Sequence, residues 1–116
     1  MFGALVRLCG LSANEAAHYL GVRRPEIIAL LRDEAAPSDE AMQKLYRLIS
    51  AQEDAADEII QAWEESGRPV SLTLRIAADA AGAQAEGWPS VAAQMAPIAI
   101  AQATLVNVSI GFDVVE

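Results

Sequence analysis

Two adjacent arginines, Arg23 and Arg24, follow closely on Gly21. A guanidinium group offers two parallel donors that match O6 and N7 of guanine, and it can also clamp phosphates. The chain of 116 residues is acidic, with a formal net charge of −8 at pH 7. The arginine pair is therefore the first candidate for contact with an anionic partner, and the alternative is a solvated turn.

The residues around the arginines have the spacing of two helices joined by a tight turn. Ala17 supplies the small side chain that the first helix needs where the two helices cross. Gly21 supplies a turn residue that tolerates a positive φ. Val22, Ile27 and Leu30 fill the crossing with aliphatic side chains. This layout is typical of a helix-turn-helix unit, whose second helix enters the major groove of DNA.

Capping signals and apolar periodicity predict four helices before Pro69. A capping box over Ser12–Glu15 begins the second helix, and a serine cap at Ser38 begins the fourth. Gln52 and Glu53 interrupt the apolar face of the fourth, which is one long helix or two nearly end to end. The expected spans are residues 2–9, 13–20, 24–33 and 39–66.

After Pro69 the hydrophobic period changes from helical to alternating. The alternation over residues 70–76 predicts a strand with one buried face. Residues 77–87 are rich in alanine and glycine and form a loop or a weak helical turn. Residues 88–105 predict a helix that its internal proline kinks or splits. Residues 106–112 alternate again and predict a second strand.

These elements predict a mainly α fold with a small β element. A helix-turn-helix bundle at residues 1–66 is followed by a strand-helix-strand dimerisation region at residues 67–116. Two strands are too few for an independently stable sheet, so we expect a helix across one face and support from a second chain. Whether the strands pair within one chain or between two is left open. The expected dimer interface contains Leu72, Leu74, Trp88, Val106, Val108, Ile110 and Phe112.

Charge and composition exclude several classes of function. Residues 1–50 carry six basic and six acidic side chains, whereas residues 51–116 carry two basic and ten acidic ones. Phosphate repels the acidic second half, which does not bind nucleic acid by itself. One cysteine and one histidine exclude an internal disulfide and a zinc or multi-histidine site. No phosphate-binding loop or nucleophile elbow is present, so we expect neither catalysis nor a cofactor or bound metal.

Residues 87–112 form a run of 26 residues without charge, which is long enough to span a bilayer. Polar residues and a proline are spread along this run, and its last part alternates like a strand. We therefore expect a buried core or a subunit interface, not a membrane span. The N-terminus lacks the basic region and the long apolar core of a signal peptide, which favours a cytoplasmic location.

Residues 3–50 resemble the lambda repressor/Cro-like (Xre-type) family of helix-turn-helix regulators. The resemblance rests on GLSANEAAHYLGVRRPEIIALL, on Pro37 and on the following MQKLYRLI. The second half is similar to YdiL-like and anti-CRISPR-associated (Aca-type) repressors through Trp88 and the run Ser90-Val91-Ala92-Ala93. These resemblances imply a transcriptional repressor that binds double-stranded DNA as a homodimer on an inverted-repeat operator and regulates its own small operon.

The same resemblance puts the DNA contacts on the second helix of the unit, where the two arginines are the main candidates for base contacts. Ile28 and Ala29 are expected to touch a thymine methyl group, and Asn14 is expected to bind phosphate. Glu26 reads a cytosine amino group or only stabilises the helix start. The main expected set is Asn14, Arg23, Arg24, Pro25, Glu26, Ile28, Ala29 and Arg32. Lys44 and Arg47 add contacts to the DNA backbone or are only solvated charges.

A hypothesis from another class is a protein-binding adaptor or antitoxin module. In that case the helix-turn-helix unit packs as a scaffold, and the acidic or apolar C-terminal half holds the partner. The acidic residues between 53 and 65 form a solubilising helix face, or they mimic DNA or dock a basic partner. Salt-dependent DNA binding that is lost without the two arginines distinguishes the two hypotheses.

Overall fold

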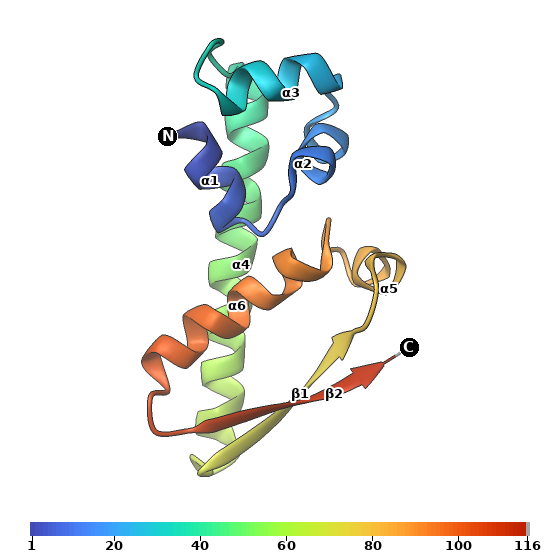
Figure 1. The fold of residues 1–116 in the computed structure, drawn as a ribbon. Coiled ribbons are helices and arrows are strands. Elements are labelled where there is room, and N and C mark those ends of the chain that lie inside the picture. Colours follow the sequence, from blue (N-terminus) through green and yellow to red (C-terminus); the bar gives the residue numbers. More distant parts are fainter. Residues whose placement is uncertain (116) are drawn as a thin grey trace.

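In the computed structural model, which describes residues 1–115, a long helix, α4 (Asp39–Glu65), is the axis of the molecule (Figure 1). The principal extents are 49 × 28 × 18 Å. Three short helices lie around the amino-terminal half of α4: α1 (Phe2–Leu8), α2 (Ala13–Leu20) and α3 (Arg24–Leu31). The expectation of a mainly α fold with a small β element is confirmed. The remaining elements are β1 (Ser71–Ala77), α5 (Ala80–Ala85), α6 (Val91–Thr104) and β2 (Ser109–Val115).

Local sequence signals set the ends of the short helices. The hydroxyl of Ser12 accepts a hydrogen bond from the N–H of Glu15, and the Glu15 carboxylate accepts one from the N–H of Ser12. The expected capping box is therefore present. Gly21 ends α2 in the left-handed conformation, with φ 69°. The third helix ends at Leu31, not at Asp33 as predicted, because Asp33 has φ 58°, which a right-handed helix does not include.

A hydrophobic core joins α1, α2 and α3 to the amino-terminal half of α4. Ile27 and Leu45 are fully buried in it. The Tyr19 hydroxyl donates to the carbonyl of Lys44 at 3.3 Å, and the Lys44 ammonium donates to the carbonyl of Tyr19 at 3.4 Å. Burial raises the pKa of the Tyr19 hydroxyl, which keeps it protonated as a donor. The buried members of this core are Phe2, Val6, Cys9, Leu11, Ala16, Leu20, Ile27, Leu30, Ala41, Leu45 and Leu48.

The fourth helix is continuous over 27 residues, so the single-helix alternative is confirmed. Gln52 interrupts its apolar face because its buried amide makes two contacts, donating to the carbonyls of Cys9 (3.0 Å) and Ala93 (3.1 Å). The Ala93 carbonyl lies four residues before Pro97, which has no N–H to offer it. Gln52 therefore supplies a hydrogen bond that Pro97 cannot make. Of the two predicted effects of Pro97, a kink or a split, the split is absent, since α6 continues through Pro97 as one helix.

The helix expected over residues 88–105 is shorter in the structure. Gly87 has φ 91°, and the hydroxyl of Ser90 accepts from the N–H of Ala93 at 2.9 Å, so α6 begins after this cap. The stretch 77–87 contains the six-residue helix α5, which agrees with the helical-turn alternative. Among residues 1–115, none of the helices combines the length and the apolarity that crossing a bilayer requires.

The two strands pair in parallel within the chain, which settles the alternative that the sequence left open. The second strand begins later than the expected span of 106–112. A turn after α6 delays it, because Gln102 donates to the carbonyls of Leu105 (2.8 Å) and Val108 (3.0 Å). Val106 and Val108 therefore precede β2, where the alternating pattern had placed them inside it.

Gly10, in the loop between α1 and α2, lies where the amino-terminal helices meet the start of α6. Its φ is 79°, and a Cβ atom there would lie 2.5 Å from the carbonyl carbon of Ala92. The hydroxyl of Ser90 donates to the Gly10 carbonyl at 2.7 Å. The α1–α2 loop thus packs directly on the start of α6. This contact crosses the expected division between residues 1–66 and 67–116, and α4 packs against elements on both sides of it.

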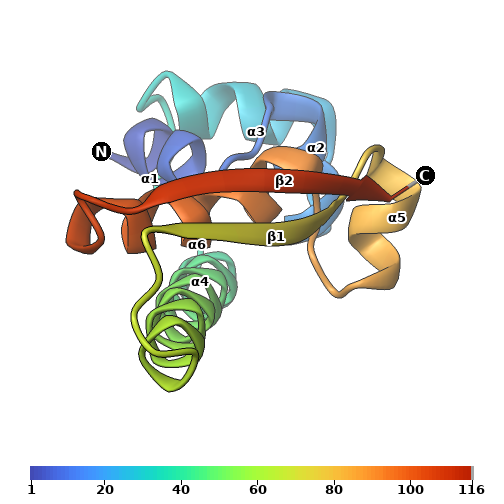
Figure 2. The same cartoon turned by 90° about the horizontal axis from the view of Figure 1, so that it is seen from below.

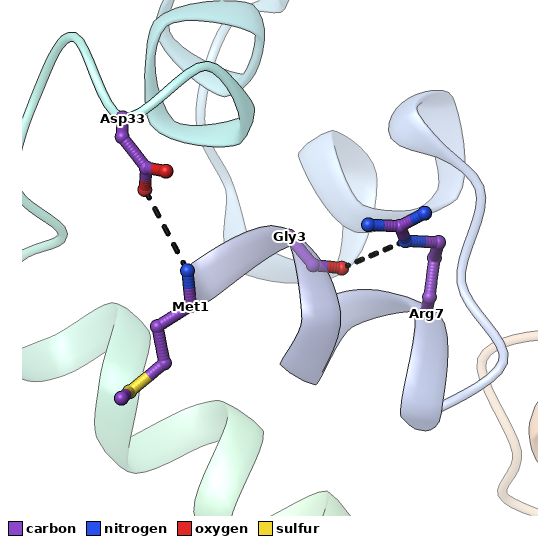
Figure 3. A network of polar contacts seen from close by, with 4 residues as sticks. All are labelled: Met1, Gly3, Arg7 and Asp33. Atoms are coloured by element: carbon purple, nitrogen blue, oxygen red, sulfur yellow. Dashed lines mark hydrogen bonds and ion pairs between the residues drawn. The ribbon is translucent and has the colours of Figure 1, made fainter.

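An exposed ion pair links the start of α1 to the segment after α3 (Figure 3). The α-amino group of Met1 lies 3.8 Å from the carboxylate of Asp33. Arg7 turns back on its own helix, with its Nε donating to the carbonyl of Gly3 at 3.4 Å. Exposed pairs of this kind contribute about 0–1 kcal/mol. The buried core, not the ion pair, therefore holds α1 against α3.

We expect Gln52→Leu to lower the free energy of unfolding by about 2–4 kcal/mol, because two buried carbonyls lose a donor. In a Pro97→Ala background the cost should be about 1 kcal/mol smaller, since the alanine N–H can reach the Ala93 carbonyl. Urea unfolding of the wild type, the two single variants and the double variant measures both values. Gln43→Leu, on the exposed face of the same helix, is the matched control. Equal costs in the two backgrounds would contradict the role of Gln52 at Pro97.

Candidate nucleic-acid interface

Helices α2 and α3 are joined by a three-residue turn at the end of the molecule away from the sheet (Figure 1). In that view α3 runs across the end of α4. Helix α2 lies beneath α3 and is seen nearly end-on. The N–H of Val22 donates to the carbonyl of Ala17 at 3.0 Å, which closes the turn. Nothing lies within 4 Å of the position of a Cβ atom on Gly21, so its φ of 69°, not lack of space, favours glycine there.

The amino end of α3 is exposed and basic. Arg23, Arg24, Pro25 and Glu26 are all exposed, and the Arg23 side chain is 85 % accessible. Arg32, at the other end of α3, is exposed too, but two acidic residues follow it directly. The exposed positive charge of α3 is therefore concentrated at its amino end, where the sequence predicted the arginine pair.

Two polar contacts organise the predicted residues into pairs. The Nη1 of Arg24 donates to Oδ1 of Asn14 at 2.6 Å, which links the start of α3 to the start of α2. The Nε of Arg23 lies 3.4 Å from Oε1 of Glu26, one turn further along α3. The spacing of these four side chains along the chain predicts four separate contacts. The structure brings Asn14 to Arg24 and Glu26 to Arg23.

Other predicted contacts are less available than expected. Ile28 and Ala29 are half-buried, and Ile28 packs against the core of the amino-terminal helices together with Leu31, three residues on. The ammonium of Lys44 contacts the backbone of Tyr19 and is half-buried, so it is not presented to a phosphate. The exposed polar groups at the amino end of α3 are thus the accessible part of the predicted set.

Sequence reasoning missed the neighbours that α5 brings to α2. A groove of about 520 Å³ lies between them, and its lining includes Asn14, His18, Gln84 and Pro89. Gln84 and Pro89 are far along the chain from α2. No local pattern marks them, since tertiary contacts carry this segment to α2: α6 packs on α4, and Ser90 bonds to the carbonyl of Gly10. The groove therefore has one wall from α2 and the other from the carboxyl-terminal half.

The strand residues expected at a dimer interface share one face of the sheet. The parallel register pairs Leu72 with Ile110 and Leu74 with Phe112, and directly paired residues point to the same side. Leu72, Leu74 and Ile110 are half-buried. Phe112 is 45 % exposed, and the next apolar residue on this face, Val114, is 53 % exposed. The single chain thus covers the β1 part of the face better than the β2 part.

The other three predicted interface residues lie elsewhere. Trp88 is half-buried and packs against the amino-terminal core of its own chain. Val108 is only 8 % exposed and belongs to the intrachain core, because the turn before β2 folds it inward. Val106, in the same turn, is 71 % exposed. Of these three residues, only Val106 keeps a largely accessible side chain.

The described residues hold neither a cluster of potential metal ligands nor an exposed thiol. Among residues 1–115 no three or more histidine, cysteine, aspartate or glutamate side chains form a group that could hold a metal ion. Cys9 is buried, and its burial raises the pKa of the thiol. The thiol is therefore protonated at neutral pH and unsuited to be a nucleophile or a metal ligand.

The sequence matches no protein-family model, and no curated protein is similar to it. The resemblance to Xre-type and Aca-type repressors accordingly stays a prediction from the sequence. The function has to be inferred from the exposed groups on α2, α3 and the sheet.

Proposed function

We propose that the protein is a sequence-specific DNA-binding repressor that acts in the cytoplasm as a homodimer on an inverted-repeat operator. Its α2–α3 unit is a helix-turn-helix in which α3 enters the major groove by its amino end and α2 crosses the DNA backbone. The observation that carries the proposal is the exposed pair Arg23–Arg24 at the amino end of α3. Regulation of its own operon follows the resemblance to Xre-type repressors.

The charge distribution supports contact with DNA at one end only. All of the net charge of −8 belongs to residues 51–116, which include β1, β2 and the carboxyl-terminal half of α4. The α2–α3 unit lies at the opposite end of α4 from the strands (Figure 1). Phosphates repel the acidic end, so DNA approaches α3 end-on, and nonspecific contact along the rest of the molecule is disfavoured.

The homodimer forms through the outer edge of β2. A two-stranded sheet leaves one edge of each strand unpaired. Figure 2 shows β1 on the side of α4 and β2 on the side away from it. The β2 strand, Ser109–Val115, contains no proline, and Asp113 is its one charged residue. Prolines and charged side chains normally protect an unpaired strand edge, and an edge with few of them is a template for pairing with another chain.

The proposed occupant of this edge is a second copy of the chain. Two-fold symmetry makes the two β2 strands antiparallel. A pairing centred on Phe112 sets Phe112 against its symmetry mate and Ile110 against Val114 of the second copy, which keeps apolar side chains on one face. Asp113 then lies opposite Gly111, so the two carboxylates are not opposed. The resulting four-stranded sheet has enough strands for independent stability.

The test of the proposal is selection of duplexes from a random DNA library by the full chain. We expect recovery of a sequence with two inverted half-sites. Arg23→Ala/Arg24→Ala should lower the affinity for that duplex at least about 100-fold, because each lost contact costs about 1–3 kcal/mol. Arg7→Ala/Arg68→Ala removes the same charge from other exposed positions and is the matched control. Equal binding by the two double variants, with unchanged circular dichroism, would contradict the assignment of α3.

The adaptor or antitoxin alternative remains the second candidate function. The observation that favours it is an acidic face on α4, whose carboxylates are all exposed. This face would dock a basic protein partner. Two results together would favour this alternative over the repressor. The selection would enrich no DNA sequence, and the chain would capture a basic protein that the Glu53→Gln/Asp57→Gln variant does not hold.

A further inference from the structure

We infer that the two adjacent arginines have different tasks: Arg23, backed by Glu26, reads a guanine, whereas Arg24, held by Asn14, clamps the DNA backbone. This inference rests on the proposed DNA-binding function and divides its recognition surface into a part that sets specificity and a part that sets affinity. The two contacts of the amino end of α3 carry it.

The geometry of Arg23 suits a base contact. Glu26 engages the Nε of Arg23 at 3.4 Å, on the inner side of the guanidinium. This contact uses Nε alone, which leaves the two terminal nitrogens, Nη1 and Nη2, available together. Such a pair of parallel donors matches O6 and N7 of guanine. The side chain is 85 % exposed, so nothing in its own chain prevents it from extending into a groove.

Glu26 acts as a positioning residue in this arrangement. A carboxylate on a surface that meets phosphates lowers affinity for every DNA sequence, because like charges repel. Its presence beside Arg23 is consistent with holding the guanidinium in one orientation, which reduces the rotamer freedom lost on binding. Glu26 therefore raises the preference for the correct base while it lowers the affinity for random DNA.

The geometry of Arg24 suits a phosphate contact instead. Asn14 engages the terminal Nη1 of Arg24 at 2.6 Å, which ties the end-on Nη1/Nη2 pair to α2 and leaves only the side-on Nε/Nη2 pair free. The bond also holds the guanidinium at the junction of α2 and α3. In helix-turn-helix complexes the first helix crosses the DNA backbone, so this junction faces phosphates. Phosphate oxygens accept hydrogen bonds from many directions and carry no sequence information.

The test compares single variants on three kinds of duplex. The first is the duplex that the wild-type chain selects from a random library, the second replaces each guanine of its half-site in turn, and the third is scrambled. We expect Arg23→Ala to lower affinity for the selected duplex at least 10-fold more than affinity for scrambled DNA, and to abolish discrimination at one guanine. Arg24→Ala should lower both affinities equally and reduce the salt slope by about 1 for each half-site.

Lysine variants and the two partner residues sharpen the comparison. Arg24→Lys should keep most of the affinity, because a phosphate accepts a point charge. Arg23→Lys should weaken base discrimination more than it weakens binding to scrambled DNA, because an ammonium lacks the preorganised planar fork that matches guanine. Asn14→Ala should follow Arg24→Ala in lowering both affinities. Glu26→Ala should raise affinity for scrambled DNA and lower the ratio of specific to random binding. A purely structural role of Glu26 would leave that ratio unchanged.

The two hypotheses fail in different ways. If the wild-type chain prefers no selected duplex over scrambled DNA, the proposed function is wrong and the division of tasks is wrong with it. If the wild-type chain has a clear preference but Arg23→Ala and Arg24→Ala lower specific and random binding alike, the division of tasks alone is overturned. An exchange of the two profiles, with Arg24 setting base discrimination, overturns it as well.

Discussion

Gly10→Ala is expected to lower the free energy of unfolding by at least about 3 kcal/mol, a large share of the stability of a small domain. A Cβ atom at this position would lie 2.5 Å from the carbonyl carbon of Ala92 and 2.6 Å from the backbone nitrogen of Ala93. Both are backbone atoms of the start of α6, so the clash is relieved only if α6 moves. Such a movement also breaks the hydrogen bond from Ser90 to the Gly10 carbonyl.

Gly67→Ala is the matched control for this prediction. Gly67 has a similar positive φ of 87°, but nothing lies within 4 Å of its Cβ position. Alanine there incurs only the conformational cost of the left-handed region, about 1–2 kcal/mol. Urea unfolding of both variants separates the clash from the backbone strain. Equal destabilisation would show that the α1–α2 loop does not pack on α6 as described.

Phe112→Asp is expected to weaken the proposed homodimer about 1,000-fold, because symmetry places the substitution at the interface twice. A pairing centred on Phe112 would oppose two carboxylates in the middle of an apolar face, which costs about 2 kcal/mol for each unpaired polar group. The monomer should remain folded, since Phe112 is already 45 % exposed in the single chain. Analytical ultracentrifugation over a range of concentrations measures the change.

Tyr46→Asp is the control for the loss of an exposed aromatic side chain. Tyr46 is 54 % exposed and lies on α4, far along the chain from the sheet. The Tyr46→Asp variant should dimerise like the wild type. The Phe112→Asp variant should still bind DNA with a single half-site but lose its preference for DNA with two half-sites. A Phe112→Asp chain that still dimerises would place the interface away from the β2 edge.

Signals read within a few residues predicted the amino-terminal elements well. The capping box at Ser12, the left-handed Gly21 and the serine cap at Ser38 each act on the adjacent turn, so the sequence alone locates them. The exposed arginine pair followed from the same local spacing. The contact between Arg24 and Asn14 could not be predicted from local spacing, because it depends on the angle at which α2 and α3 cross.

Features that depend on distant partners could not be predicted. Gln52 looked like a break in α4 because its acceptors, the carbonyls of Cys9 and Ala93, are about 40 residues away in either direction. The turn that Gln102 holds after α6 delayed β2, although the alternation over residues 106–112 reads as a strand. Parallel pairing within the chain was left open, because alternation identifies a buried face but not its neighbour.

The measurement that tests the proposed repressor function most directly is binding of the wild-type chain to its selected duplex, titrated over several salt concentrations with scrambled duplex as competitor. We expect a preference of at least about 1,000-fold over scrambled DNA and an affinity that falls linearly with the logarithm of salt concentration. The steep slope would report the phosphate contacts around α2 and α3. Equal affinity for both duplexes at every salt concentration, or no binding to either, would contradict sequence-specific recognition by this protein.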